Sequence, residues 1–337
     1  MSEPSPTPQR RGRLLRCLAA LLVLLAVAGY LVVQYVNGGP GAPGCKVVSS
    51  EEGGASYRFT PEQAVNAATI AAVGTGRDMP ERAVTIALAT ALQESGLRNI
   101  EHGDRDSLGL FQQRPSQGWG TQKQIMDPTY AAGIFYEHLA KVPGYTELPL
   151  TVAAQRVQRS GFPEAYAKHE PDAALLAAAL TGQAAASLTC DGRPGTQVAA
   201  TGPDAVRAAL VRDFGRDAFE EAGAEVGGQG TAPSKKPSPS VTAEARGRTV
   251  TVPVPADDAP AGGTDTKPPT RRTERERGWQ LAHWAVANSS ALRIERVSYA
   301  GRQWTAGSTD SQWRSTASAG TKGAEASAGA VRIVTGQ

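Results

Sequence analysis

The apolar and polar positions divide this chain into a charge-free segment, a helical region, a polar linker and a C-terminal region of mixed periodicity. The charge-free segment runs from Cys17 to Val36, about the length that crosses a hydrocarbon core as a helix. Residues 1–16 carry an arginine cluster, and few basic residues follow the apolar segment directly. The positive-inside rule therefore predicts a cytoplasmic basic tail over 1–16, a single transmembrane helix over 17–36, and a chain outside the cytoplasm beyond it.

A cleaved signal peptide is the alternative for this segment. Ala26-Val27-Ala28 has the small-residue pattern of a cleavage site, and cleavage near Ala28 would release a secreted protein. The apolar run continues from Gly29 to Val36, past that site, which favours an uncleaved anchor in the cell membrane. In both cases the bulk of the chain is exported.

Beyond a Gly- and Ser-rich stalk over 37–57, helix signals follow one another closely. Thr60 to Gln63 is a capping box with proline at the first helical position, and Gly74 closes the helix that it opens. A second box at Asp78 to Glu81 starts a helix with one apolar face, and Asp127-Pro128 starts a third. Shorter helices are expected over 150–159, 163–169 and 171–181. Because no run alternates with period two, residues 58–190 are predicted to form an all-helical domain.

The remaining chain is expected to be a linker and a small domain. Residues 191–274 are rich in Pro, Gly, Ser and charge, which is typical of a disordered, flexible tether. Within it, 203–214 has the pattern of a short amphipathic helix and 249–254 that of an isolated strand. Residues 275–337 are predicted to form a small α+β accessory domain. A helix is expected around Trp279, and strands are expected over 294–299, 303–305, 313–314 and 331–335.

Two interpretations fit the tryptophans of this C-terminal region. Four of the five in the chain lie there, at 279, 284, 304 and 313. They indicate either a glycan-binding surface that presents aromatic rings or a small core that needs large side chains. The second interpretation is favoured.

Composition and charge limit the classes of function. With 337 residues there is room for about two domains, and 23 prolines and 37 glycines indicate much irregular chain. The formal net charge of +3 is already present in residues 1–16, so the rest of the chain is formally neutral. A nucleic-acid-binding protein usually carries a basic stripe, so that class is poorly supported.

Cysteine and histidine usage excludes further kinds of site. Cys45 and Cys190 are the only cysteines outside the apolar segment, and an oxidising compartment favours a disulfide between them. Two free thiols are the alternative. The three cysteines and the four histidines are scattered and form no metal-ligand spacing. The sequence therefore predicts neither a metal nor a cofactor, and a metal-transport function is not supported.

Glu94 is the strongest candidate for chemistry. It lies on the last turn of its predicted helix, just before Gly96 and beside the apolar face. The C-terminal end of a helix and apolar neighbours both disfavour the ionised form of a carboxyl. A carboxyl that stays protonated near neutral pH is what a general acid for a glycosidic oxygen requires. A solvated surface charge is the alternative for a lone glutamate.

The residues around Glu94 resemble the active-site motifs of lysozyme-like enzymes. Glu94-Ser95 on a helix, followed by Ser107-Leu108-Gly109-Leu110-Phe111-Gln112, is similar to the signature of lytic transglycosylases and goose-type lysozymes, which cleave peptidoglycan glycan strands. Several membrane-anchored wall proteins of actinobacteria resemble the whole stretch. The likeness covers roughly residues 60–190 and implies a lysozyme-like helical fold. It also implies that Ser107 and Gln112 lie beside the catalytic carboxyl and that Gln113, Arg114 and Trp119 continue the wall of the cleft. Polar loop residues without a role in binding are the alternative for Ser107 and Gln112.

The resemblance leaves two mechanisms open. Hydrolysis by two carboxylates would need a second acid, and the loop after Glu94 offers Asp104 and Asp106. Of the two, Asp106 roughly matches the supporting acid of goose-type lysozymes. An aspartate beside a glycine-rich loop is also a common turn former. Without a second acid, Glu94 alone would give a 1,6-anhydro product by the lytic transglycosylase route.

The later part of the region departs from the family pattern. These families carry an Ala-Tyr-Asn-like motif on a later helix, and the corresponding stretch here runs from Ala153 to Ser160 without a tyrosine. Tyr166 is the candidate for the missing phenol. This departure favours the alternative function, a non-catalytic wall-binding protein with a lysozyme-like fold.

The sequence thus predicts a mainly α protein with an N-terminal transmembrane helix. A lysozyme-like helical domain and a small α+β C-terminal domain on a disordered linker would follow. Its expected partners are peptidoglycan glycan strands and the cell membrane, with no nucleic acid and no metal.

Overall fold

The computed structural model describes most of the chain beyond residue 43 and two short stretches before it. The residues described are 18–21, 23–30, 44–51, 53–161, 163–192, 201–216, 247–257, 272–307, 312–316 and 329–336. The chain divides into two compact units, residues 1–43 and residues 44–337.

The expectation of an N-terminal transmembrane helix is wrong for the part of the chain that is described. No helix there has both the length and the apolar character needed to cross a membrane. The helical residues described in the apolar segment are 18–21 and 23–30, and at about 1.5 Å per residue each stretch is much shorter than a hydrocarbon core of about 30 Å. Cys17 and residues 31–36, which complete the apolar run, lie outside the described residues.

The first region of the second unit is not all-helical, because a small sheet brings its two ends together. Strands β1 (Cys45–Val48), β2 (Ser56–Phe59) and β3 (Leu188–Cys190) form an antiparallel sheet in the order β2-β1-β3. Strands of three or four residues are too short to give a period-two pattern, and the β1–β3 pairing joins segments that are far apart in the sequence. The fold class is therefore corrected to helices combined with antiparallel sheets.

Helices build the body of this region between the strands. They are α2 (Pro61–Gly76), α3 (Glu81–Ser95), η1 (Pro115–Gln117), α4 (Gln122–Ile125), α5 (Pro128–Ala140), α6 (Leu150–Gln158), η2 (Pro163–His169) and α7 (Glu170–Leu180). The capping box at Thr60 forms as expected, and Asp127 caps α5 by accepting a hydrogen bond from the backbone N–H of Thr129. The expected box at Asp78 does not form, because α3 begins after Pro80 without a side-chain cap. The alanine-rich faces of α2, α3 and α7 pack together as the core.

The expected linker over 191–274 is described only in part. Helix α8 (Pro203–Phe214) covers the range expected to be helical. Strand β4 (Thr249–Pro253) is not isolated, because it pairs with a C-terminal strand. The rest of the linker, residues 193–200, 217–246 and 258–271, lies outside the described residues.

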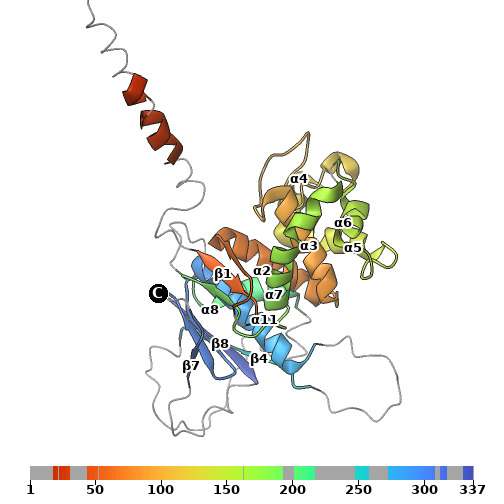
Figure 1. Ribbon diagram of the computed structural model, residues 1–337. Coiled ribbons are helices and arrows are strands. Elements are labelled where there is room, and N and C mark those ends of the chain that lie inside the picture. Colours follow the sequence, from red (N-terminus) through yellow and green to blue (C-terminus); the bar gives the residue numbers. More distant parts are fainter. Residues whose placement is uncertain are drawn as a thin grey trace, which may run out of the picture. The chain divides into compact units, whose positions relative to one another are not determined.

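The C-terminal region packs directly on the helices of the first region (Figure 1). It contains α11 (Glu274–Ala287), α12 (Ser289–Leu292), β5 (Ile294–Tyr299), β6 (Arg302–Thr305), β7 (Arg314–Ser315) and β8 (Ala330–Thr335). The strands form one antiparallel sheet in the order β4-β8-β5-β6-β7. Helix α11 contacts α2 and α7 on one side and β5 and β8 on the other, so one helix joins the sheet to the first region.

The tryptophans of this region form a core. Trp279, Trp284, Trp304 and Trp313 are all buried, and none presents its ring to solvent. The indole N–H groups of Trp304 and Trp313 donate hydrogen bonds to the backbone oxygens of Cys190 and Leu188. These rings therefore fasten the C-terminal region to β3, and the interpretation as a small core holds.

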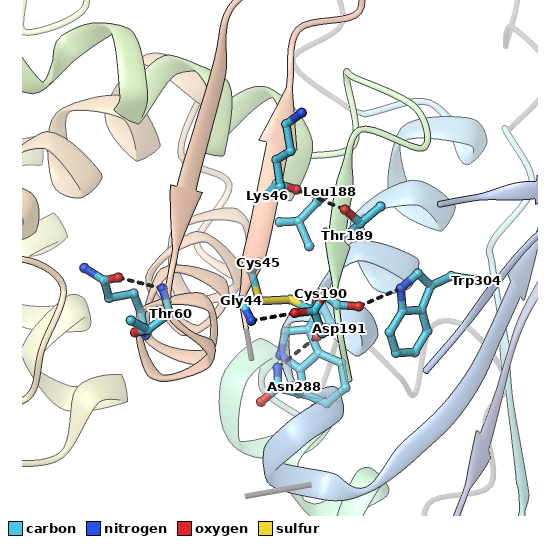
Figure 2. Close-up of a disulfide and its surroundings, with 12 residues drawn as sticks. Gly44, Cys45, Lys46, Thr60, Leu188, Thr189, Cys190, Asp191, Asn288 and Trp304 are labelled. Atoms are coloured by element: carbon cyan, nitrogen blue, oxygen red, sulfur yellow. Dashed lines mark hydrogen bonds between the residues drawn. A yellow bond between two sulfur atoms is a disulfide. The ribbon is translucent and has the colours of Figure 1, made fainter. Parts of the chain in front are cut away.

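The predicted disulfide is confirmed. Cys45 and Cys190 are bonded and lie directly opposite each other in the β1–β3 pair, as Figure 2 shows. Beside it, the backbone N–H of Gly44 donates to the carboxylate of Asp191. A disulfide that closes so long a loop typically stabilises a fold by about 2–5 kcal/mol, chiefly by restricting the unfolded chain.

Candidate functional site around Glu94

Glu94 lies half-buried on the last turn of α3. The helix ends because Gly96 adopts the left-handed conformation (φ 63°) and its backbone N–H bonds back to Leu92. A residue with a side chain adopts this conformation at a cost, so the glycine is a favourable stop signal. The helix end thus sets both the position of Glu94 and the direction in which its side chain leaves the helix.

Two side chains from later segments reach the Glu94 carboxyl group. The hydroxyl of Tyr166, in η2, donates a hydrogen bond to Oε1 of Glu94 at 2.7 Å. The side-chain amide of Gln158, at the end of α6, lies close enough to the carboxyl group to lower its pKa. The amide nitrogen of Gln158 donates a hydrogen bond to the backbone oxygen of Phe111 at 2.7 Å, which fixes the orientation of the amide.

Burial raises the pKa of Glu94 above its ordinary value. The hydrogen bond from Tyr166 and the nearby amide of Gln158 act in the opposite direction, because they stabilise the carboxylate, but they do not cancel the effect of burial. Burial and the neighbouring carboxylate also raise the pKa of Tyr166. The phenol therefore stays a proton donor, and Glu94 has a raised affinity for a proton.

A second layer of contacts holds Tyr166 and the turn before it. The side chain of Ser160 lies close enough to the phenol of Tyr166 to lower its pKa. The amide of Gln155 donates to the backbone oxygen of Ser160 at 2.8 Å. The turn between α6 and η2 is thereby tied to the group that contacts Glu94.

The glycine-containing loop after α3 is anchored to the helix end. The hydroxyl of Ser95 donates to the backbone oxygens of Ala91 and Leu110. The buried ring of Phe111 stacks on Phe135 of α5 with centroids 4.7 Å apart. Phe111 also supplies the backbone oxygen that accepts the hydrogen bond from Gln158. The loop therefore holds Gln158 in place beside Glu94.

The expected substrate-contacting residues of this loop are largely turned into the protein. Ser107 and Gln113 are buried. The amide nitrogen of Gln113 donates to the backbone oxygen of Ala131 at 3.1 Å. Gln112 has a positive φ of 48°, and its amide nitrogen donates to the backbone oxygen of Gly109 at 3.2 Å. These contacts shape the loop, and they leave Glu94, Tyr166 and Gln158 as the residues that share direct contacts.

Asp106 is engaged in the loop itself. Its carboxylate accepts hydrogen bonds from Nε of Arg114 at 2.7 Å and from the backbone N–H of Ser116 at 2.9 Å. These hydrogen bonds from Ser116 and Arg114 hold the pKa of Asp106 far below its usual range. Asp106 is thus ionised at neutral pH and stabilises its own loop. None of its hydrogen bonds to described residues involves Glu94, Tyr166 or Gln158.

Trp119 lies on the side of the first region formed by α4 and α5. Its half-buried indole stacks on His138 with ring centroids 4.3 Å apart. The hydroxyl of Tyr130 donates to its backbone oxygen. Burial lowers the pKa of His138, so the stacked imidazole is predominantly neutral at pH 7.

Sequence reasoning identified Glu94 and Tyr166 but missed Gln158 and Ser160. Both lie in the stretch that lacks the family's tyrosine motif, so they carried no recognisable pattern. The available signal was the pair of glutamines at 155 and 158, one helical turn apart in a helix whose other polar residues are Thr151 and Arg156. No cluster of three or more potential metal ligands occurs among the described residues.

Comparison with known proteins gives one partial match to a family model and no match to a curated protein. A family model described as "VldE, C-terminal domain" matches residues 259–326, which is about a fifth of the chain. That match covers part of the expected linker and α11 to β7, and it does not include the Glu94 site. No curated protein matches the chain.

Proposed function

We propose that this protein cleaves the glycan strands of peptidoglycan, with Glu94 as the single acid and base. The observation that carries the proposal is a half-buried carboxyl whose pKa is raised by burial and which accepts a hydrogen bond from the hydroxyl of Tyr166. The resemblance of the Glu94-Ser95 and Ser107–Gln112 motifs to lysozyme-like enzymes supplies the substrate class. No metal or cofactor enters the proposed reaction.

The chemistry follows from one carboxyl group used twice. Protonated Glu94 donates its proton to the glycosidic oxygen, and the bond between that oxygen and C1 of the sugar breaks. The carboxylate then takes the proton of the C6 hydroxyl of the same sugar, whose oxygen bonds to C1 and closes a 1,6-anhydro ring. Between the two steps, the hydrogen bond from Tyr166 and the nearby amide of Gln158 stabilise the charge of the carboxylate in a partly buried site.

The state of Asp106 favours this route over hydrolysis with two carboxylates. A general base must accept a proton from water, and a carboxylate whose pKa is held far below its usual range is a weak base. Its oxygens are also occupied by Arg114 and Ser116. We therefore assign Asp106 to the loop and give the chemistry to Glu94.

The proposed place of action is outside the cytoplasm. A disulfide between Cys45 and Cys190 is typical of an oxidising compartment, and peptidoglycan lies there. This part of the proposal rests on the disulfide and the proposed substrate.

Mass spectrometry of muropeptides released from purified peptidoglycan tests the proposal. The full chain should release anhydro-muropeptides, and Glu94→Gln should lower the rate by roughly 10²- to 10⁴-fold, the usual contribution of a general acid–base group. Glu62→Gln, an exposed carboxyl in the first turn of α2, is the control and should release products at the wild-type rate. Reducing-end products, together with a comparable loss in Asp106→Asn, would contradict the single-carboxyl mechanism.

A non-catalytic wall-binding protein is the second candidate function. The burial of Ser107 and Gln113, which the resemblance assigns to substrate contact, favours it. In that case the wild type would release no muropeptides, yet it would sediment with insoluble peptidoglycan, and Glu94→Gln would sediment equally well.

A further inference from the structure

The outward face of the five-stranded sheet carries positive charge and hydrogen-bonding groups in register. The inward row of Val250, Ile333, Val297 and Trp304 is buried. Neighbouring residues along each strand point to the opposite face. The opposite row joins, in order, Thr251, Arg332, Ser298, Gln303 and Arg314, and it crosses all five strands.

A second outward row lies beside the first. It joins Thr249, Val334, Arg296 and Thr305. Arg296 is thus a diagonal neighbour of Arg332, within the reach of two long side chains from one ligand. Both arginines are exposed, and neither side chain has a hydrogen bond or ion pair with another described residue.

The charge on these strands is predominantly positive. Strands β4 to β8 contain four arginines and one acidic residue, Glu295. Glu295 lies at the bulge that begins β5, and its carboxylate faces Arg248 at 3.7 Å. The two outward rows therefore contain no carboxylate of their own, although the chain beyond residue 16 is formally neutral.

The chemistry of the two rows selects among anionic partners. Single-stranded nucleic acids are bound by aromatic rings that stack on bases, but Tyr299, Trp304 and Trp313 all face inward and are buried. Membrane-surface segments add large apolar side chains to the basic ones. Among the outward-facing strand residues described, only Val334 and Pro253 are aliphatic and larger than alanine, and Pro253 lies at the end of β4. Arginine, threonine, serine and glutamine suit a ligand that offers phosphate oxygens and hydroxyl groups side by side.

We propose that the outward face of β4 to β8, centred on Arg296 and Arg332, binds a phosphodiester-linked polyol or sugar polymer of the cell wall. The choice of a wall polymer rests on the proposed function, because the same surface would hold the protein on the wall while Glu94 acts on the glycan strand. Binding and cleavage use different residues, so each can fail without the other.

A binding assay with soluble poly(glycerol phosphate) tests this inference. The protein is the full chain with Glu94→Gln, so that no cleavage complicates the result. We expect binding that weakens steeply with added salt, since the attraction is largely electrostatic. The double variant Arg296→Gln/Arg332→Gln should bind roughly tenfold more weakly, and Arg296→Lys/Arg332→Lys should retain most of the affinity.

The matched control removes two positive charges elsewhere. Arg58→Gln/Arg216→Gln alters two exposed arginines outside the five-stranded sheet, and its affinity should change by less than about twofold. An equal loss of affinity in both double variants would contradict binding at the outward face of the sheet. Binding by the parent protein that does not weaken with added salt would also contradict the proposal. Tighter binding to polyuridylate or to anionic phospholipid vesicles than to poly(glycerol phosphate) would overturn the assignment of the partner.

A cell-wall experiment connects the face to its proposed partner. Sacculi from a Gram-positive wall retain the phosphodiester polymer, and treatment with hydrofluoric acid removes it while leaving peptidoglycan. The parent protein should sediment more with untreated than with treated sacculi, and the Arg296→Gln/Arg332→Gln variant should lose that difference. Equal sedimentation of the parent protein with both preparations would contradict the proposal.

Discussion

The carboxyl of Glu94 is subject to two opposing influences. Burial at the end of α3 raises its pKa, and donors from η2 and α6 lower it. The net effect is a raised pKa, which suits Glu94 to act as an acid. The hydrogen-bond donors limit that rise, so the carboxylate can still form in the second half of the proposed reaction. A half-buried carboxyl of this kind costs stability when it ionises, which is common at functional sites.

The variant Glu94→Gln should therefore be more stable than the wild type at pH 7. The pKa of Glu94 is raised in the folded state, so its favourable contribution is present below the unfolded pKa and is lost as pH rises through the folded value. Glutamine keeps the shape and does not ionise. Urea unfolding at pH 4 and pH 7 measures the effect. The free energy of unfolding of the variant should increase relative to that of the wild type as pH rises. A constant difference between the two proteins would contradict the raised pKa.

The variant Tyr166→Phe should raise the pKa of Glu94 further. The phenol donates to the carboxylate at 2.7 Å, and its hydrogen bond lowers the carboxyl pKa. Titration of the Glu94 carboxyl carbon by NMR should give a higher pKa in the variant. Tyr130→Phe, a phenol that donates to a backbone oxygen near Trp119, should leave the Glu94 titration unchanged. A lower or unchanged pKa in Tyr166→Phe would exclude this hydrogen bond.

At the scale of elements, α11 shows how local signals and packing combine. Its capping box at Thr273 and Glu276 is a sequence signal, but the predicted helix was centred on the tryptophans and the box was missed. Gly278 lies inside this helix, where glycine ordinarily destabilises. The ring of Tyr299 explains the glycine, because a methyl group at Gly278 would overlap with that ring.

The variant Gly278→Ala should destabilise the protein by about 1–3 kcal/mol, the usual cost of overpacking a well-filled core. The alanine would gain helix propensity, but it would force the ring of Tyr299 away from the helix. Gly247→Ala is the control, because nothing lies within 4 Å of its added methyl group. Urea denaturation followed by tryptophan fluorescence compares the two. A stabilised Gly278→Ala would mean that the helix and β5 do not approach so closely.

The short strands are the elements that sequence periodicity could not provide. Strand β3 has three residues and β7 has two, so neither holds a repeat of the alternating pattern. Their positions depend on partners far away in the chain. The helices were predictable, since capping residues and apolar spacing are local signals.

At the scale of the whole molecule, the polar groups that α8 and α11 bury connect segments far apart in the sequence. The carboxylate of Asp213 accepts hydrogen bonds from the indole of Trp284 and the hydroxyl of Thr69. His283 bridges α7 and β3, because Nδ1–H donates to the oxygen of Ala179 and Nε2 accepts the backbone N–H of Ser187. These contacts make the C-terminal region part of the same compact unit as the Glu94 site.

The stability of this unit should fall in mild acid because of His283. Burial lowers its pKa to about 4, whereas an unfolded histidine titrates near 6.5. As pH falls from 7.5 to 5, the unfolded chain binds a proton that the folded chain does not, which costs about 2 kcal/mol. Urea unfolding at the two pH values should show this loss in the wild type and in the exposed control His102→Gln, and His283→Gln should lack it. Equal acid sensitivity in His283→Gln would assign the loss to other groups.

Local sequence signals were sufficient to predict the helices of the first region, the disulfide partners and the candidate carboxyl, because caps, apolar spacing, cysteine count and short motifs need no distant contact. The folded structure was needed to show that the ends of that region pair as strands, that the tryptophans form a core against β3, and that Gln158 and Tyr166 lie beside Glu94. It was also needed to show that Asp106 is paired with Arg114 and that four arginines lie in one sheet. These features depend on contacts between residues tens to hundreds of positions apart, and no local pattern encodes which distant partners meet.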